Sequence, residues 1–404
     1  MIARRLMMTV WPLLLAAPLV SAAGTGSASD AGPAEAETTE TETTPAEAKA
    51  EVGPFTDPQD GAFDVSTWLL ERKGFLPVPL IISEPAIGYG GGLAALFFRG
   101  TLGEGMSSRR LSPPDIYGVM LAGTDNGTRF GGAFGMKTFA QENWRWKGAV
   151  GRPDINIDFY GAGGDLGTGD ASIAYNLEGW ATTQQLMRRI GEGGNFIGGR
   201  WIWLDLASRF NGDALPPPIA ERSREATNSG LGLFFEHDSR DNFFTASRGW
   251  KGYLESMFYS PAFGGDNRFE MYRAYAFGYL PVREAFVLGG RVDFRAARGD
   301  VPFYQLPYVE MRGIPAARYQ DENIALVETE VRWNATPRWA FVGFTGTARS
   351  WGTNGNFGDA DTASAYGLGV RRLIARRLGM HVGVDVARGP EETAFYIQVG
   401  SAWR

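Results

Sequence analysis

The feature that most constrains this chain is a regular alternation of apolar and polar side chains. From about residue 86 to the C-terminus, stretches of about 9 to 16 residues follow a two-residue period and end in turns rich in Gly, Asp, Asn or Pro. In residues 325–333 one face is uncharged and the other charged: Val327, Thr329, Val331 and Trp333 against Glu328, Glu330 and Arg332. A charge on a lipid-facing barrel wall costs about 2 to 4 kcal/mol at mid-membrane, whereas a wet lumen accepts it. The pattern therefore predicts an all-β transmembrane barrel rather than a soluble β-sandwich, whose charges would lie outside.

The number of strands follows from the same pattern. No run of 18 apolar residues occurs in the chain, which excludes transmembrane helices. The 55 glycines, 26 phenylalanines, 14 tyrosines and 12 tryptophans are typical of the turns and aromatic belts of outer-membrane barrels. Our count is fifteen or sixteen strands, depending on whether Asn143–Gly161 is one strand or is broken at Pro153, which cannot donate to a ladder. Because single-chain bacterial barrels have even strand numbers, we predict a 16-stranded antiparallel barrel with a lumen-inserted loop and a short N-terminal helix.

The N-terminus has the three parts of a secretory signal. Arg4 and Arg5 precede an apolar run at 6–20, and the small residues Ala22 and Ala23 mark the expected cleavage site. The run is about 15 residues long, short of the roughly 20 that cross a bilayer as a helix. We therefore expect a cleaved signal peptide and export to the outer membrane of a Gram-negative bacterium.

Three segments are expected before or within the mature protein. Residues 24–53 hold seven acids, one lysine and no aromatic residue, which predicts a disordered linker, or alternatively an acidic segment that binds a basic partner. A helix is expected from Asp64, its N-cap, to Arg72, with Gly74 as the stop, packed on the barrel rim or inside the lumen. The predicted organisation is: 1–23 signal peptide, 24–53 acidic linker, 54–85 short segment with the helix, 86–404 barrel. Of the net charge of -6 only -2 remains for residues 54–404, which argues against a nucleic-acid partner.

One connection is much longer than the others. Residues 300–322 separate two strands, and a loop of this length is uncommon unless it has its own role. Its centre contains Arg312, Gly313 and Ile314, a permanently charged fork followed by a residue that readily takes φ > 0. This composition predicts a tight tip.

With these motifs the sequence resembles the BamA/TamA-like outer-membrane barrels, also called the bacterial surface antigen family. The tip Arg312-Gly313-Ile314, followed by Glu328 and Glu330, matches the family's signature loop and the strand after it. A second match is the hairpin motif, formed by Asp238, Arg240, Asp241, Asn242 and Gly249. Residues 396–403 are similar to a C-terminal assembly signal, and the resemblance covers roughly 80–404. It implies that the loop folds into the lumen, where Arg312 pairs with Glu328, Glu330 or Asp385.

The sequence departs from the family in two ways. The strand after the loop's own usually carries an aspartate in a Phe-x-Asp-x-Gly pattern, but here the run Phe344–Ala348 contains no acid, so the arginine's usual partner is missing. The family's insertases and translocases also carry repeated periplasmic domains that receive clients, and the 32 residues at 54–85 are fewer than the roughly 40 that fold without staples. The resemblance therefore supports the barrel more strongly than protein insertion.

The meeting of the first and last strands is the expected seam. We place Gly88, Gly90, Gly91 and Gly92 in the first strand and Trp403 at the end of the last. Glycines inside a strand weaken it by about 0.5 to 1 kcal/mol each, so the seam would open easily and offer an edge to a client strand. The alternative is that these glycines relieve crowding at a bend or against the lumen loop.

Other signals point to no chemistry. The glycine-rich run 161–167 is interpreted as a turn, because no helix or βαβ unit surrounds it. His237 and His381 are the two histidines, without a serine at reachable spacing, and the chain has no cysteine, so we predict no enzyme, metal or cofactor. The expected function is outer-membrane protein assembly or protein or lipid translocation; the alternative is a passive pore or structural barrel. The expected partners are outer-membrane lipid and, as candidates, client β-barrel strands or periplasmic assembly factors.

Overall fold

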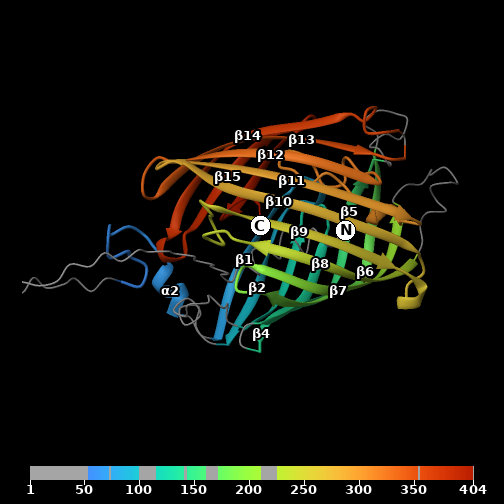
Figure 1. Ribbon diagram of the computed structural model, residues 1–404, viewed down its shortest axis with the longest axis horizontal. Helices are drawn as coiled ribbons and strands as arrows, with labels where there is room; N and C mark the ends of the chain where they lie inside the picture. Colours follow the sequence, from blue (N-terminus) through green and yellow to red (C-terminus); the bar gives the residue numbers. More distant parts are fainter. Residues whose placement is uncertain are drawn as a thin grey trace, which may run out of the picture.

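The computed structural model describes residues 53–71, 74–99, 115–140, 143–160, 172–210, 225–353 and 355–403. They form one antiparallel sheet of sixteen strands in sequence order, curled into a nearly closed barrel (Figure 1). The helices and strands are: α2 Ser66–Glu71, β1 Gly74–Glu84, η1 Pro85–Ile87, β2 Gly88–Arg99, β3 Asp115–Thr124, β4 Arg129–Phe139, β5 Trp144–Phe159, β6 Ile173–Ile190, β7 Asn195–Phe210, β8 Glu225–Asp238, β9 Gly249–Tyr259, η3 Pro261–Phe263, β10 Phe269–Arg283, β11 Phe286–Gly299, η4 Phe303–Gln305, β12 Asn323–Asn334, β13 Trp339–Trp351, β14 Thr362–Ala375, η5 Arg376–Leu378, β15 Met380–Arg388 and β16 Thr393–Val399.

The predicted sixteen-stranded barrel is confirmed, but one strand lies where we did not expect it. Asn143–Gly161 contains the single strand β5; Pro153 is paired with Phe130 of β4, and only the ladder to β6 skips a step beside it. The additional strand that brings the number to sixteen is β1, at the start of the sheet. The barrel therefore begins at Gly74 rather than at residue 86. The sequence did not indicate this strand because it contains Pro77 and Pro79, and proline is tolerated in a strand mainly at the edge of a sheet.

The outer wall is apolar, as the alternation predicts. On β12, Val327, Val331 and Trp333 are exposed, while Glu328 and Glu330 between them are buried. Three exposed tryptophans lie at the same end of the barrel: Trp250 on β9, Trp333 on β12 and Trp339 on β13. Aromatic residues at this level are typical of a membrane–water boundary.

The inner wall has two different halves. On β1–β7 the inward positions are mostly apolar too, and Leu96, Ile116, Phe134, Ile155 and Leu177 are buried in one large cluster. On β8–β15 the inward positions carry most of the buried ion pairs, such as Arg291–Glu328 and Arg371–Asp385. The expectation of an ionic lumen therefore holds for the second half of the barrel only.

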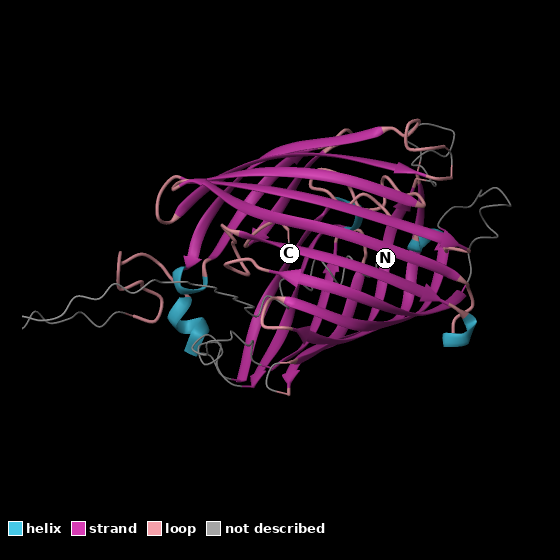
Figure 2. Ribbon diagram, in the orientation of Figure 1, coloured by secondary structure: helices cyan, strands magenta, loops and turns pink. Residues whose placement is uncertain are grey.

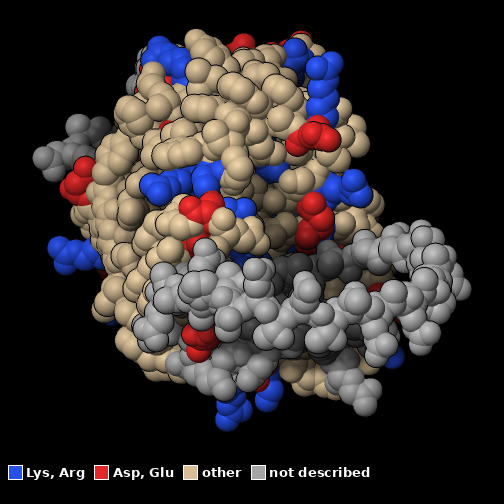
Figure 3. All heavy atoms as spheres, turned by 90° about the vertical axis from the view of Figure 1, so that its left-hand side faces the viewer, with Lys and Arg blue, Asp and Glu red and all other residues tan. Residues whose placement is uncertain are grey.

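The two ends of the barrel also differ. The near end, on the left in Figure 1, carries α2 and the turns after the even-numbered strands; the far end carries the turns after the odd-numbered ones. Loop 300–322 leaves β11 at the far end and runs inside the barrel (Figure 2). Viewed from the near end, basic and acidic side chains lie together across the middle of the molecule (Figure 3).

Candidate functional site: a lumen loop and the strand seam

Loop 300–322 folds as an irregular hairpin. Val309 N donates to Tyr319 O, and Tyr308 and Gln320 form an antiparallel bridge. At the tip, Ile314 N donates to Met311 O, and Gly313 takes φ 85°, the left-handed conformation expected there. Ile314 is fully buried among apolar side chains of β12, β13 and β14. The tip is therefore packed inside the barrel and not solvated outside it.

Arg312 at the tip is held by three strands. Its Nη1 donates to Asp385 Oδ2 of β15 at 2.9 Å, and its Nη2 to Glu330 Oε2 of β12 at 2.8 Å. The guanidinium lies 3.5 Å from the ring centroid of Phe344 on β13. Charge-assisted hydrogen bonds and a cation–π contact are both strengthened when water is excluded. Arg312 thus contacts two of the three acids proposed for it.

The missing aspartate on β13 is replaced from elsewhere. Phe344, in the run that lacks the acid, contributes its ring face, and the carboxylate comes from Asp385 two strands away. Asp385 is completely buried and also accepts from both terminal nitrogens of Arg371, at 2.5 and 2.9 Å. We call Arg312 with its contacts to Glu330, Phe344 and Asp385 the latch. In it one acid, Asp385, is shared by two arginines, Arg312 and Arg371.

Glu328, the third proposed partner, has other contacts. It accepts from Arg291 Nη1 at 2.7 Å and from Trp403 Nε1 at 3.1 Å. Trp403 therefore lies inside the barrel against Phe277 and Tyr279, and its expected place at the seam is wrong. The chain turns inward after β16, where Ser401 N donates to the Phe244 carbonyl.

A second ionic cluster binds the middle of the loop, close to its tip, to β10 and β11. Asp293 Oδ2 accepts from Arg273, Arg291 and Arg295 at 2.7, 2.8 and 2.8 Å. Arg295 also pairs with Glu310 of the loop. Arg291, Asp293 and Arg295 alternate along β11 and therefore share one face, whereas no sequence pattern joins Glu310 or Arg273 to them.

The hairpin motif forms the turn between β8 and β9 and folds over the near end. Asp238 accepts from Arg240 at 2.7 Å, and Gly249 takes φ 90° at the start of β9. Asn242 Nδ2 donates to the Leu378 carbonyl, and Asp241 Oδ1 accepts from the backbone N–H of Ser247 and Arg248. Arg332 of β12 donates to the Ala246 carbonyl and to Ser247 Oγ. The motif thus holds a turn inside the near opening of the barrel.

The seam lies between β1 and β16. No ladder joins these two strands among the residues described, and Ile397 N donates to Ser83 Oγ at 3.4 Å across it. The lumen loop contacts both strands: Gly313 N donates to Tyr396 Oη of β16 at 2.9 Å, and Ala316 N to Glu84 Oε1 of β1 at 3.1 Å. The loop tip therefore bridges the seam from inside.

The glycines proposed for the seam are not in the first strand. Gly88, Gly90, Gly91 and Gly92 belong to β2, which is paired on both sides. A Cβ on Gly90 would lie 2.1 Å from the Gly123 carbonyl oxygen, and one on Gly92 2.2 Å from that of Leu121. These two glycines allow β2 and β3 to approach closely, so the crowding they relieve is with the neighbouring strand rather than at a bend or against the lumen loop.

An unexpected ion-pair cluster fixes the N-terminal segment to the near rim. Arg338, in the turn after β12, donates to Asp57, Asp60 and Asp64 at 2.5 to 2.8 Å, and Arg376 of η5 pairs with Asp57 and Asp60. Hydrogen bonding by Arg338 holds the pKa of Asp60 well below its ordinary value. Burial raises the pKa of Asp64, but hydrogen bonds from Ser66 and Arg338 outweigh it and leave that pKa lowered.

Helix α2 runs from Ser66 to Glu71 and so begins two residues after the expected Asp64, whose Oδ1 accepts from Ser66 N. Arg377 N of η5 donates to Ser66 Oγ, which places the helix on the near rim, one of its two expected positions. The acids occur three and four residues apart, but nothing in the sequence indicated partners more than 270 positions away. In the part of the chain described, no helix is long and apolar enough to cross a membrane, and no group of acids and histidines is arranged to hold a metal ion. Arg72, residues 1–52 and the 161–167 run lie outside the described residues.

Comparison with known proteins places the fold. No family model matches the chain, and no curated protein sequence matches it. Among solved structures, it is similar to BamA from Haemophilus ducreyi lacking POTRA domains 1–3, with TM-score 0.56 and 11% identity over 81% of this chain and 71% of that one. It is also similar to CdiB from Escherichia coli (TM-score 0.54, 13% identity, 81% and 62%) and from Acinetobacter baumannii (0.53, 13%, 81% and 59%). The chain thus spans about 60% of the CdiB chains.

At this identity the likeness is one of fold. The chain has the BamA-type outer-membrane barrel fold that the resemblance of its motifs implied.

Proposed function

We propose that this barrel works in the outer membrane by opening the seam between β1 and β16, and so assists the assembly of other barrels or the translocation of protein or lipid. The observation that carries the proposal is the seam itself. Within the described residues its two strands share no backbone ladder, and the buried loop tip contacts both of them through Gly313 and Ala316. An edge without a ladder is a template for another strand.

Loop 300–322 is the part that holds the seam shut. Its tip is fixed to the wall by Arg312 and Ile314, and its backbone donates to Tyr396 and Glu84 on the two seam strands. Moving the tip away removes both contacts at once. The latch and the seam therefore form one mechanical unit, and client strands or lipid would reach the edge of β1 only after the loop has shifted.

The edge of β1 restricts what it can accept. Pro77 and Pro79 have no N–H, and proline in a strand lies with that side away from the ladder. Since β1 pairs with β2 over its whole length, both prolines point toward the seam. A client strand could then receive N–H donors from Ile81 and Ser83 near the far end, but none from 77 or 79.

The remaining parts of the proposal rest on composition. The signal peptide at 1–23 would be cleaved, the acidic linker at 24–53 would lie in the periplasm, and the near end would face that compartment, because periplasmic turns are generally the shorter ones. Periplasmic assembly factors would then meet the rim at Asp57–Asp64. No catalytic role is proposed for any residue.

A reversible lock across the seam tests the proposal. Ser83→Cys with Ile397→Cys places two thiols on facing outward positions, in a chain that has no native cysteine. Leu93→Cys with Leu121→Cys, directly paired on β2 and β3 and both exposed, is the matched control. Oxidation of the first pair should halt growth or assembly of other barrels, and a reductant should restore it. If the locked seam supports normal assembly and lipid transport, the proposal is wrong.

The passive-pore alternative predicts a different result. A steady pore needs an open lumen, whereas here the loop and the β8–β9 turn enter the barrel from opposite ends. Planar-bilayer recordings of the native chain should show only brief openings, and Arg312→Ala should lengthen them. A large steady conductance that Arg312→Ala leaves unchanged would favour the pore.

A further inference from the structure

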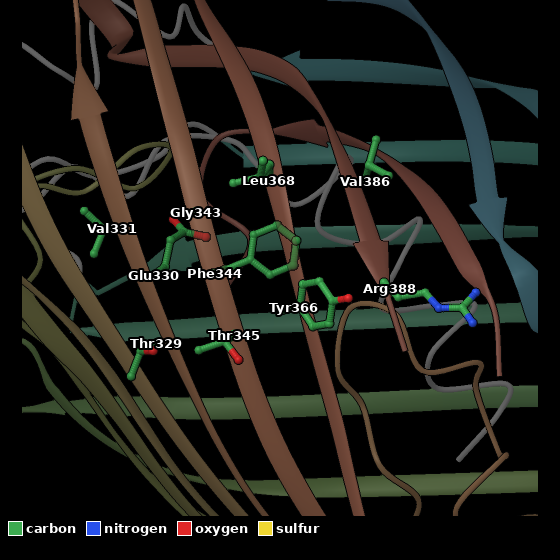
Figure 4. A pocket seen from close by; sticks show the side chains of 11 residues that line it. Thr329, Glu330, Val331, Gly343, Phe344, Thr345, Tyr366, Leu368, Val386 and Arg388 are labelled. Atoms are coloured by element: carbon green, nitrogen blue, oxygen red, sulfur yellow. The ribbon is translucent and has the colours of Figure 1, made fainter. Parts of the chain in front are cut away.

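The outer wall of β12–β15 contains a depression behind the latch. It has a volume of about 620 Å³ and is lined mainly by outward side chains of these four strands, including Val331, Tyr366, Leu368 and Val386 (Figure 4). Gly343 of β13 leaves the space open, because a Cβ there would meet only Leu368 Cδ2, at 3.7 Å. The depression faces the side that the exposed apolar residues assign to lipid.

Strand register divides the depression into two rows. Thr329, Thr345, Tyr366 and Arg388 are paired in succession across the four strands, and Val331, Gly343, Leu368 and Val386 form the next row. The first row is polar and ends in a cation; the second is apolar. One row is about 6.6 Å from the next, two residues of strand rise. The lining of the depression thus changes from polar to apolar over this distance, in the same way that a lipid changes from its headgroup to its acyl chains.

Arg388 supplies the charge at the far-end side. Its side chain is exposed, lines the depression and donates to Thr393 Oγ1 at 3.3 Å. None of the other lining residues with outward side chains is charged. A guanidinium beside hydroxyl groups matches a phosphate, and the apolar row beyond it matches hydrocarbon.

We propose that this depression binds one membrane lipid with an anionic phosphate headgroup, its phosphate on Arg388 and its acyl chain over Gly343 between Val331 and Leu368. This goes beyond the seam-opening function and does not depend on it. The site backs directly onto the latch, since Glu330 and Phe344, which contact Arg312, belong to the same strand segments. Only the single layer of the sheet separates the depression on the outside from the latch on the inside.

Native mass spectrometry of the purified full chain in neutral detergent tests the site. The barrel is titrated with phosphatidylglycerol, with a diacylglycerol of the same chains, and with inorganic phosphate. One phosphatidylglycerol should be retained with clear preference over the diacylglycerol, and inorganic phosphate alone should not bind. Binding of inorganic phosphate as tightly as the lipid, or equal retention of both lipids, would overturn the proposal.

Matched variants locate the site. Gly343→Leu fills the apolar row and should weaken retention about tenfold or more, while Gly290→Leu, on the outer wall of β11 with no atom within 4 Å of its Cβ, should leave it unchanged. Arg388→Gln should abolish the preference for phosphatidylglycerol, whereas Arg349→Gln, at a half-buried arginine of β13 outside the depression, should keep it. If the control variants lose as much binding as the test variants, or if a co-purified protein rather than lipid occupies the face, the assignment is wrong.

Discussion

The two halves of the barrel interior are held by different forces. On β1–β7 inward side chains such as Ile155 and Leu177 pack into an apolar cluster, which is stabilised in proportion to the area removed from water. On β8–β15 the interior is an array of arginines and carboxylates, in which Asp293 and Asp385 each pair with two or more guanidinium groups. Packing of the first kind tolerates small shifts, whereas paired buried charges depend strictly on position.

The lumen loop joins the two halves because it carries both kinds of side chain. Tyr304, Tyr308 and Ala316 belong to the large apolar cluster, while Glu310 and Arg312 belong to the ionic wall. The seam lies at the boundary of the two halves. To leave the ionic wall the tip must break both the ion pairs of Arg312 and the apolar packing of Ile314 beside them.

The largest effect is expected from breaking the ionic wall at its centre. Asp385→Ala leaves Arg312 and Arg371 buried without their shared carboxylate, which costs about 3 to 5 kcal/mol. The free energy of unfolding, from urea titration in lipid vesicles, should fall by this amount, whereas the exposed Glu225→Gln should change it little. A loss below about 1 kcal/mol would show that the wall is not held by this pair.

Next in size is a cavity in the apolar wall. Ile155 is completely buried on β5, and Ile155→Ala should cost about 3 kcal/mol through lost burial and the space left behind. Because no charge is involved, the loss should be the same in low and high salt. If it instead varied with ionic strength as strongly as that of Asp385→Ala, the proposed contrast between the halves would not hold.

A milder change sharpens the geometry of the latch. Arg312→Lys keeps the charge but loses the planar fork that reaches Asp385 and Glu330 and stacks on Phe344. We expect a loss of about 1 to 2 kcal/mol in unfolding free energy and more frequent openings in bilayer recordings. Wild-type stability and gating in this variant would mean that charge alone holds the loop.

The smallest effect concerns the rim, where pairs are more exposed than in the wall. The lowered pKa values of Asp60 and Asp64 mean that docking of the N-terminal segment is fully stabilised above pH 3.8 and is lost as the pH falls through their lowered values. Limited proteolysis near Gly61 should therefore be unchanged from pH 8 to 5. Arg338→Gln should release the segment already at pH 7; release of the native segment between pH 7 and 5 would contradict the assignment.

The sequence predicted what depends on local periodicity and residue chemistry. Alternation predicted the barrel and the strands from β2 onward, and the rule of even strand numbers led to sixteen although the extra strand was expected at Pro153 and lies at β1. A charged fork before a glycine predicted the tight tip at Arg312, and its place in the lumen was implied by the family resemblance. The resemblance implied Glu328, Glu330 or Asp385 as the partner of Arg312 without choosing among them, because only the strand register decides which carboxylates meet the tip. Glu328 lies on the same inward face as Glu330, but it forms an ion pair with Arg291 of the neighbouring strand β11 instead of with Arg312.

What was missed depends on contacts between distant segments. β1 was overlooked since two prolines usually exclude a strand, and the rule changes only at an edge that the sequence does not mark. The rim cluster joins Asp57 to Arg338 and Arg376 across most of the chain. The turn inward that buries Trp403 likewise depends on the β8–β9 turn, whose position no local pattern gives.

The two prolines of β1 give the seam a direction. If β1 accepts an incoming strand as proposed, the N–H donors at 81 and 83 would let pairing begin at the far end, and the prolines at 77 and 79 would stop it before the near end. A client strand would thus be held by only a few backbone hydrogen bonds and would dissociate easily. Such an edge would favour release of the client strand, because a strand that pairs with only part of β1 is bound less tightly than one that pairs along its whole length.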